Sequence, residues 1–142
     1  MGIVNFIRYN HYKGLTLKAY FYSAGYRVCI LMIKPDKLRR YWGVEGKESS
    51  EEENMEAYRY ARRVARSVEH VCNKTAWESK CLVRALTAQR LLKKRHISST
   101  LYLGCGITEG KMTAHAWLRC GKMYVTGGDG SGYAVVDTFY AG

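Results

Sequence analysis

Acidic residues, paired cysteines and long apolar segments are scarce in this chain of 142 residues. The longest uninterrupted apolar run, Val28 to Ile33, is far shorter than the ~20 residues that a membrane span needs. The first residues contain no basic segment followed by an apolar stretch, so we expect no signal peptide. These absences predict a cytoplasmic protein that has no membrane span.

The cysteines are five in number and widely spaced, and no two of them form a C-x-x-C pair. A disulfide framework needs an even count in a small secreted chain, and a structural zinc site needs paired ligands at short spacing. We therefore expect reduced thiols, most of them packed in the core, and neither a metal nor an organic cofactor.

Only 12 acidic residues accompany 23 basic ones, which gives a formal net charge of +11. The excess positive charge is spread over both halves of the chain and forms no separate basic tail. It indicates either a solvated surface or an acidic partner. Because the sequence has none of the RNA- or DNA-binding signatures, we do not expect nucleic acid to be that partner.

Apolar residues recur at helical spacing through the first two thirds of the chain. Pro35 ends the first helical segment. Ser49 and Ser50 each stand three residues before a glutamate, which is the pattern of a capping box, and Ser79 is suited to cap a later helix. The expected helices cover residues 15–30, 36–41, 51–71 and 79–95.

Beyond His96 the sequence changes to short β-branched or aromatic runs separated by turns that contain glycine. Helices followed by an antiparallel sheet define an α+β fold. We expect a single domain over 1–142, with a helical N-terminal region at 1–72 packed on a core at 73–142 that carries the chemistry. The expected strands cover residues 97–103, 112–119, 123–126 and 133–139.

Cys81 is distinguished from the other cysteines by its position in the first turn of the helix that Ser79 would cap. Free backbone N–H groups and the helix dipole stabilise a thiolate there, and Lys80 and Arg84 add positive charge. The same N–H groups can hold an oxyanion, so the position suits a cysteine nucleophile. The alternative is a buried cysteine that packs against the sheet.

His115 lies within Ala114–His115–Ala116–Trp117, on a strand that we expect to be half-buried. A cysteine protease needs an imidazole that acts first as base and then as acid toward the thiol, and a third group that fixes its tautomer. His115 is therefore the candidate base. The alternative is a histidine with a structural role.

The third group has few candidates, because the chain contains only three aspartates, Asp36, Asp129 and Asp137. If residues 120–122 form a hairpin loop, residue 127 lies opposite His115 and Asp129 is diagonally adjacent on the same face. Asp137 requires the next strand to fold back beside His115. Asp129 is thus the predicted third residue, although its glycine-rich surroundings also suit a turn.

Three motifs together resemble the leader peptidase of lasso-peptide biosynthesis, in its stand-alone protease form. They are the segment from Trp77 through Cys81 to Leu86, then Leu101–Gly104, then Ala114–Leu118. The resemblance implies a transglutaminase-like, papain-type core with Cys81 as nucleophile and His115 as general base. The family commonly has its aspartate about where Gly127 stands here. The ring would therefore be oriented by Asp129, by Asp137, or by a backbone carbonyl or water.

The resemblance also implies an activity and partners. The protein would be a cysteine endopeptidase that removes the leader from a ribosomally synthesised precursor peptide. Its partners would be the precursor's leader region, a separate leader-recognition protein and a lasso cyclase. Two other classes stay open: a transglutaminase-type acyltransferase that uses the same Cys and His, and a non-catalytic basic protein that binds peptide or RNA.

An acidic leader or partner would suit the positive surface, and this idea predicts a strong effect of ionic strength. Exposed charges that attract one another are screened within about 8 Å at physiological salt. We expect the rate of leader cleavage to fall steeply as salt is added, measured by mass spectrometry over a salt series. Cleavage that does not depend on salt would remove the electrostatic role.

Overall fold

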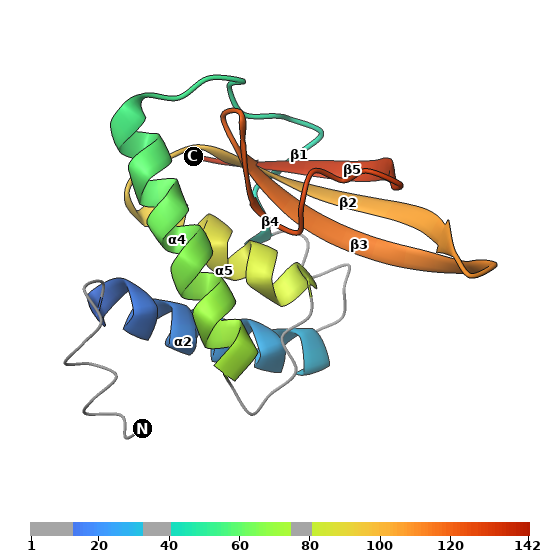
Figure 1. Ribbon diagram of the computed structural model, residues 1–142, viewed down its shortest axis with the longest axis horizontal. Helices are drawn as coiled ribbons and strands as arrows, with labels where there is room; N and C mark the ends of the chain where they lie inside the picture. Colours follow the sequence, from blue (N-terminus) through green and yellow to red (C-terminus); the bar gives the residue numbers. More distant parts are fainter. Residues whose placement is uncertain (1–12, 33–40, 75–80) are drawn as a thin grey trace.

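The computed structural model describes residues 13–32, 41–74 and 81–142, and within these ranges the helices precede most of the sheet (Figure 1). The helices are α2 (Lys13–Met32), α4 (Met55–Lys74) and α5 (Cys81–Lys94). The strands are β1 (Val44–Glu45), β2 (Ser99–Thr108), β3 (Lys111–Cys120), β4 (Met123–Thr126) and β5 (Ala134–Ala141). The predicted α+β class is confirmed. Residues 36–40 of the predicted short helix, and Trp77 and Ser79, lie outside the described ranges.

The described strands form one antiparallel sheet in the order β1-β5-β2-β3-β4. The long hairpin of β2 and β3 forms its centre, with pairs from Thr100↔Arg119 to Thr108↔Lys111. β4 lies beside β3, whereas β5 lies on the far side of β2. The connection from β4 to β5, residues 127–133, must therefore cross the faces of β3 and β2.

One face of this sheet is covered by helices. Leu101 and Leu118 form a directly opposed pair, and both are fully buried in one apolar core with Leu86 and Leu92 of α5. Helices α2 and α4 pack on α5, so all three described helices lie on the same side of the sheet (Figure 1). None of the three has the combined length and apolar character that a membrane span requires.

The opposite face carries the alternate residues of β3, among them His115, Trp117 and Arg119, because successive side chains of a strand point to opposite faces. Trp117 and Arg119 are nevertheless buried. Residues 127–133 and the segment before α4 cover this face in place of helices.

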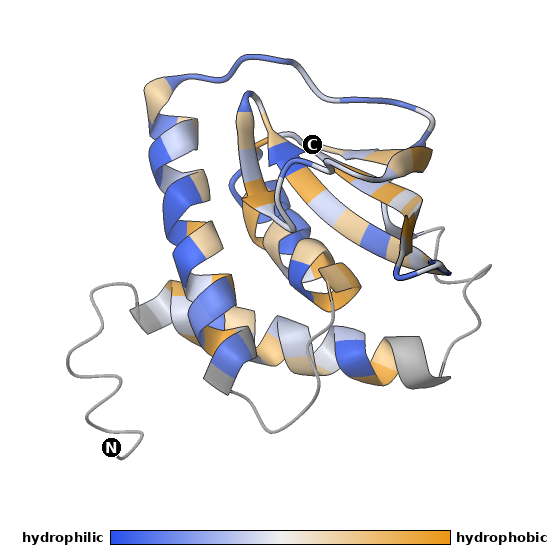
Figure 2. Ribbon diagram, turned by 45° about the vertical axis from the view of Figure 1, so that its right-hand side comes forward, coloured by the Kyte–Doolittle hydropathy of each residue, from blue (hydrophilic) through white to orange (hydrophobic). Residues whose placement is uncertain are grey.

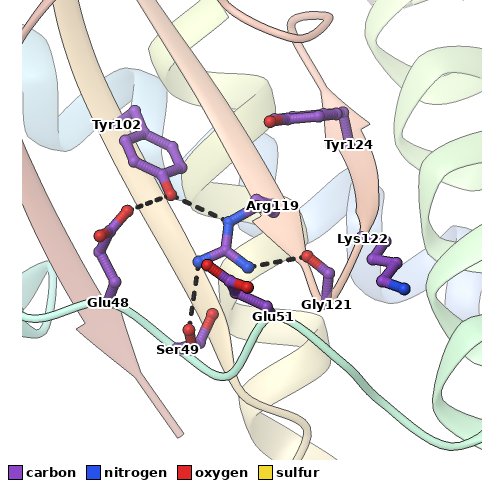
Figure 3. Close-up of a pocket in the computed structure, with 8 residues that line it drawn as sticks. All are labelled: Glu48, Ser49, Glu51, Tyr102, Arg119, Gly121, Lys122 and Tyr124. Carbon is purple, nitrogen blue, oxygen red and sulfur yellow. Dashed lines mark hydrogen bonds between the residues drawn. The ribbon is translucent and has the colours of Figure 1, made fainter.

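Arg119 attaches that segment to the sheet. Its guanidinium donates to the carbonyls of Ser49 and Ser50, both at 3.1 Å, and to that of Gly121 at 2.7 Å. Its Nε donates to the Tyr102 hydroxyl at 2.9 Å, and that hydroxyl donates to a Glu48 carboxylate oxygen. Burial and the Glu48 bond raise the pKa of Tyr102, which keeps the hydroxyl protonated as a donor. Figure 3 shows most of this network among the residues that line a pocket of about 420 Å³.

The predicted capping boxes are not formed, and α4 begins later than residue 51. The backbone N–H and hydroxyl of Ser49 bond to the Thr100 hydroxyl at 2.7 and 2.6 Å, which removes Ser49 from any helix start. The cap is Asn54, whose Oδ1 accepts the backbone N–H of Ala57 at 2.8 Å. The segment between β1 and Asn54 is therefore irregular and forms no helix.

Replacement of the buried guanidinium provides a test of its contribution to stability. Arg119→Met keeps the apolar stem but leaves the carbonyls of Ser49, Ser50 and Gly121 without this donor, and each such acceptor costs about 1–3 kcal/mol. We expect the free energy of unfolding in urea to fall by roughly 3 kcal/mol. The control is Arg62→Met, at an exposed position of α4, which should change it by less than about 0.5 kcal/mol. Equal effects of the two variants would contradict a special role for Arg119.

Candidate active site

Cys81 is the first described residue of α5 and is half-buried. With Leu82 it packs against the apolar core between α5 and the sheet. Arg84, one turn further on, donates from Nη2 to the Asn73 Oδ1 at 2.8 Å and so joins α5 to the end of α4. The predicted location of Cys81 at the start of a helix agrees with α5 as described, which begins at this residue.

His115 lies on β3 opposite Gly104, and its ring is half-buried on the face away from α5. The ring nitrogen Nε2 lies 2.7 Å from the carbonyl oxygen of Gly127. A carbonyl oxygen can only accept, so Nε2 carries the proton in this hydrogen bond. In the neutral ring Nδ1 is then the free base, because the hydrogen bond of one nitrogen decides the state of the other.

The His115 ring packs against two aromatic rings. Its centroid lies 4.7 Å from that of Tyr133 and 5.8 Å from that of Trp117, and both pairs are stacked. Trp117 stacks in turn on Tyr102 at 5.4 Å. The rings of Tyr102, Trp117 and His115 form a column over β2 and β3, and the Tyr133 ring packs against both His115 and Trp117, because its centroid also lies 6.3 Å from that of Trp117.

Glycines allow this column to lie close to the backbone. A Cβ at Gly104 would meet two ring carbons of Trp117 at 2.8 Å and the carbonyl of Ala134 at 2.9 Å. Gly127 has a φ of +77° and Gly130 a φ of +79°, and a Cβ on either would clash with Trp117. The glycine-rich run is therefore a close-fitting cover over Trp117, and its path brings the Gly127 carbonyl to the imidazole.

Asp129 is exposed and does not contact the imidazole. Its Oδ1 accepts the backbone N–H of Ser131 at 2.9 Å and the hydroxyl of the same residue at 2.6 Å. These two bonds lower the pKa of Asp129 and keep its carboxylate charged. The geometry is that of a local turn around an aspartate. The predicted catalytic role of Asp129 has no support from this arrangement.

Asp137 is half-buried on the other side of the sheet. It pairs with Leu103 across β2 and β5, and Leu103 packs against the core beneath α5. A register shift between Leu103 and Gly104 separates this pair from the His115 row. The described structure therefore places Asp137 on the α5 face, with Cys81, and the imidazole on the opposite face.

The expected hairpin loop of residues 120–122 is wrong by one residue. Cys120 pairs with Met123, so the turn consists of Gly121 and Lys122 alone, with Gly121 at a φ of +56°. The hydroxyl of Tyr58 accepts the backbone N–H of Lys122 at 3.0 Å and occupies the space that a Cβ at Gly121 would need. A second register shift follows at Leu118, which pairs with Thr126.

Cys81 and His115 are not joined by a hydrogen bond in the part of the chain that the structure describes. They lie on different sides of β3. Within the described ranges β4 pairs with β3 only from Leu118 onward, so β3 is an edge of the sheet at His115. The described structure therefore does not bring the predicted nucleophile and the predicted base together.

One of the alternatives from the sequence was a backbone carbonyl that orients the His115 ring. In the structure the Gly127 carbonyl bonds to that ring. Tyr133 was not foreseen, because its stacking depends on the path of the crossing segment. Within residues 13–32, 41–74 and 81–142, no three His, Cys, Asp or Glu side chains lie close enough together to hold a metal ion.

These features define an α+β protein with a cysteine at a helix start and an oriented histidine at a sheet edge. Residues 36–138 match the model of the transglutaminase-like superfamily, and this match covers more than half of the chain. The chain belongs to the transglutaminase-like superfamily, whose members are commonly cysteine-dependent enzymes. No curated protein and no solved structure matches the chain.

The variant Gly104→Ala, on β2 opposite His115, tests how closely the aromatic rings pack on the sheet. Gly104→Ala places a carbon within 3 Å of Trp117 and of the β5 backbone, so we expect a loss of about 1–3 kcal/mol in unfolding free energy. The near-ultraviolet circular dichroism of the aromatic rings should change with it.

The matched control is Gly25→Ala in α2, where nothing lies within 4 Å of the new Cβ. It should be neutral or stabilise the protein by up to about 1 kcal/mol, because alanine favours a helix. An unchanged spectrum and stability in Gly104→Ala would contradict the close packing of the column.

Proposed function

We propose that the protein is a cysteine peptidase that removes the leader from a ribosomally synthesised precursor peptide. The observation that carries the proposal is a cysteine at the start of α5 in a chain of the transglutaminase-like superfamily. The order of the Cys81 and His115 motifs, which resembles that of lasso-peptide leader peptidases, supports this choice of substrate.

In the proposed reaction the thiolate of Cys81 attacks the carbonyl carbon of the scissile peptide bond. His115 takes the thiol proton and then gives it to the leaving amine, which becomes the free amino terminus of the core peptide. The leader stays attached to Cys81 as a thioester. Water, deprotonated by His115, then hydrolyses the thioester, which releases the leader carboxylate and restores the thiol.

The N-terminal N–H groups of α5 supply the oxyanion stabilisation in this proposal. In this proposal the Cys81 backbone N–H, at the first described residue of α5, donates to the negative oxygen that forms on the attacked carbonyl. The helix dipole favours both that oxygen and the thiolate. No cofactor is needed for either step.

The state of the imidazole supports the role of His115. Donation from Nε2 to the Gly127 carbonyl, at 2.7 Å, leaves Nδ1 with the lone pair that a base requires. The carbonyl also stabilises the imidazolium that forms, because its oxygen still accepts from Nε2. The function that an aspartate would serve is thereby proposed for the main chain.

Catalysis requires Nδ1 and the thiol to come within hydrogen-bond reach around the exposed edge of β3. Catalytic hydrogen bonds are often long before substrate binds and shorten in the complex. By resemblance, a separate protein presents the leader and a lasso cyclase uses the new amino terminus. The edge of β3 beside His115, which no strand of the described ranges pairs with, suits the binding of a peptide strand.

Three single variants test the assignment with a candidate lasso precursor and its leader-recognition protein. Cys81→Ala and His115→Ala should yield no cleavage product by mass spectrometry. Asp129→Ala should cleave within about threefold of the wild-type rate, because Asp129 bonds only to Ser131. Cys120→Ala is the matched thiol control: that thiol is fully buried in the core, away from solvent, and burial raises its pKa to about 11.

Each result has a separate meaning. Cleavage by Cys81→Ala would overturn the peptidase mechanism, and strong loss in Asp129→Ala would restore the aspartate as the orienting group. A product in which an added amine has replaced the ammonia of a precursor glutamine, without free leader, would indicate acyl transfer and contradict hydrolysis.

A further inference from the structure

The outer face of α4 carries an arginine row, which we define as Arg59, Arg62 and Arg66. At 100° per residue the three positions fall within about 60° of the helix circumference, so they form one narrow stripe about 10 Å long. All three side chains are exposed. The opposite face of α4 is apolar and buried against α2 and α5, so the stripe points away from the core (Figure 2).

The row has no charge partner within residues 13–32, 41–74 and 81–142. None of its guanidinium groups makes an ion pair or a hydrogen bond there, in contrast to Arg119, which makes several. Like charges at i, i+3 and i+4 repel one another on a helix. The arrangement is unfavourable for the free helix, and a negatively charged partner would relieve it.

The choice of arginine at all three positions indicates which anionic groups the partner carries. All three cations are arginines, whose planar guanidinium pairs with a carboxylate or a phosphate through two parallel hydrogen bonds. Fifteen N–H donors, five on each side chain, therefore face solvent along the row.

The acidic residues at the two ends of the arginine row favour a short acidic peptide over a nucleic acid as the partner. Exposed Glu56 precedes the row by one turn, and exposed Glu69 follows it by one turn. A nucleic-acid backbone carries a charge every few ångströms without interruption, and it would meet both glutamates. An acidic peptide segment of three or four residues, at about 3.3 Å each, fits between them.

We infer that the arginine row on α4 is a docking surface for an acidic polypeptide segment. The surface is built from exposed side chains on a helix that contributes neither Cys81 nor His115. Binding at the row is therefore separate from the proposed cleavage and holds whether or not the chain is a peptidase.

The test is a direct binding titration of the full chain with a fluorescein-labelled oligoglutamate peptide, followed by fluorescence anisotropy at low salt. The row variant is the triple replacement Arg59→Gln, Arg62→Gln and Arg66→Gln, in which glutamine retains helix propensity. We expect its Kd to rise about tenfold or more, as three exposed ion pairs are lost. Circular dichroism verifies that the helices are intact.

The control variant removes the same number of charges from dispersed exposed positions, with Lys18→Gln, Lys93→Gln and Lys111→Gln. The two triple variants are compared at about 0.15 M salt, where a screening length of about 8 Å largely removes the attraction of dispersed charges, so the control's Kd should change less than about threefold. Equal weakening in both triple variants would overturn the inference, because net charge alone would then explain binding. So would the absence of peptide binding at low salt.

A third arm replaces the peptide with an oligothymidylate of the same net charge. Tighter binding of the oligonucleotide, with the same loss in the row variant, would overturn the acidic polypeptide as the partner. Weaker binding of the oligonucleotide supports it.

Discussion

The outer face of the sheet depends on the hydrogen bonds of one buried guanidinium. Arg119 is nearly inaccessible to solvent, yet its donors reach the carbonyls of Ser49, Ser50 and Gly121 and the Tyr102 hydroxyl. An irregular segment can cover a sheet only when its carbonyls find donors. Arg119 provides them, so a strand side chain determines where the preceding segment lies and hence where α4 can begin.

The order and type of the main elements were predictable from local patterns. Helical spacing of apolar residues indicated α2, α4 and α5, and β-branched runs indicated β2 to β5, because both signals lie within a few residues of one another. The start of α4 was not predictable in this way. Ser49 could cap a helix or bond to Thr100, and the second partner is 51 residues away. The hairpin register failed for a related reason: the Tyr58 hydroxyl occupies the turn, and a register shift follows at Leu118.

In the candidate site, too, some features could be predicted from local sequence and others depended on distant contacts. Cys81 and His115 could be proposed because a nucleophile and a base need particular side chains in particular settings. The acceptor for the ring could not be chosen from the sequence, since every residue has a carbonyl. Asp129 was selected because it has a carboxylate and because the assumed hairpin register placed it diagonally beside His115. Instead, neighbouring Ser131 offers that carboxylate two donors. The segment that carries Asp129 contributes a backbone atom of Gly127 to the ring instead.

A main-chain acceptor has consequences for how this protein can change over generations. A carboxylate partner is lost by one nucleotide substitution, whereas the Gly127 oxygen is present whichever amino acid is encoded. The feature that must be inherited is the path of residues 127–133. That path depends on glycines with positive φ that lie over Trp117. Under the proposed mechanism, comparison of descendants of this chain would therefore find two invariant side chains, Cys81 and His115, and no third. The invariant that completes the set would be a pattern of glycines.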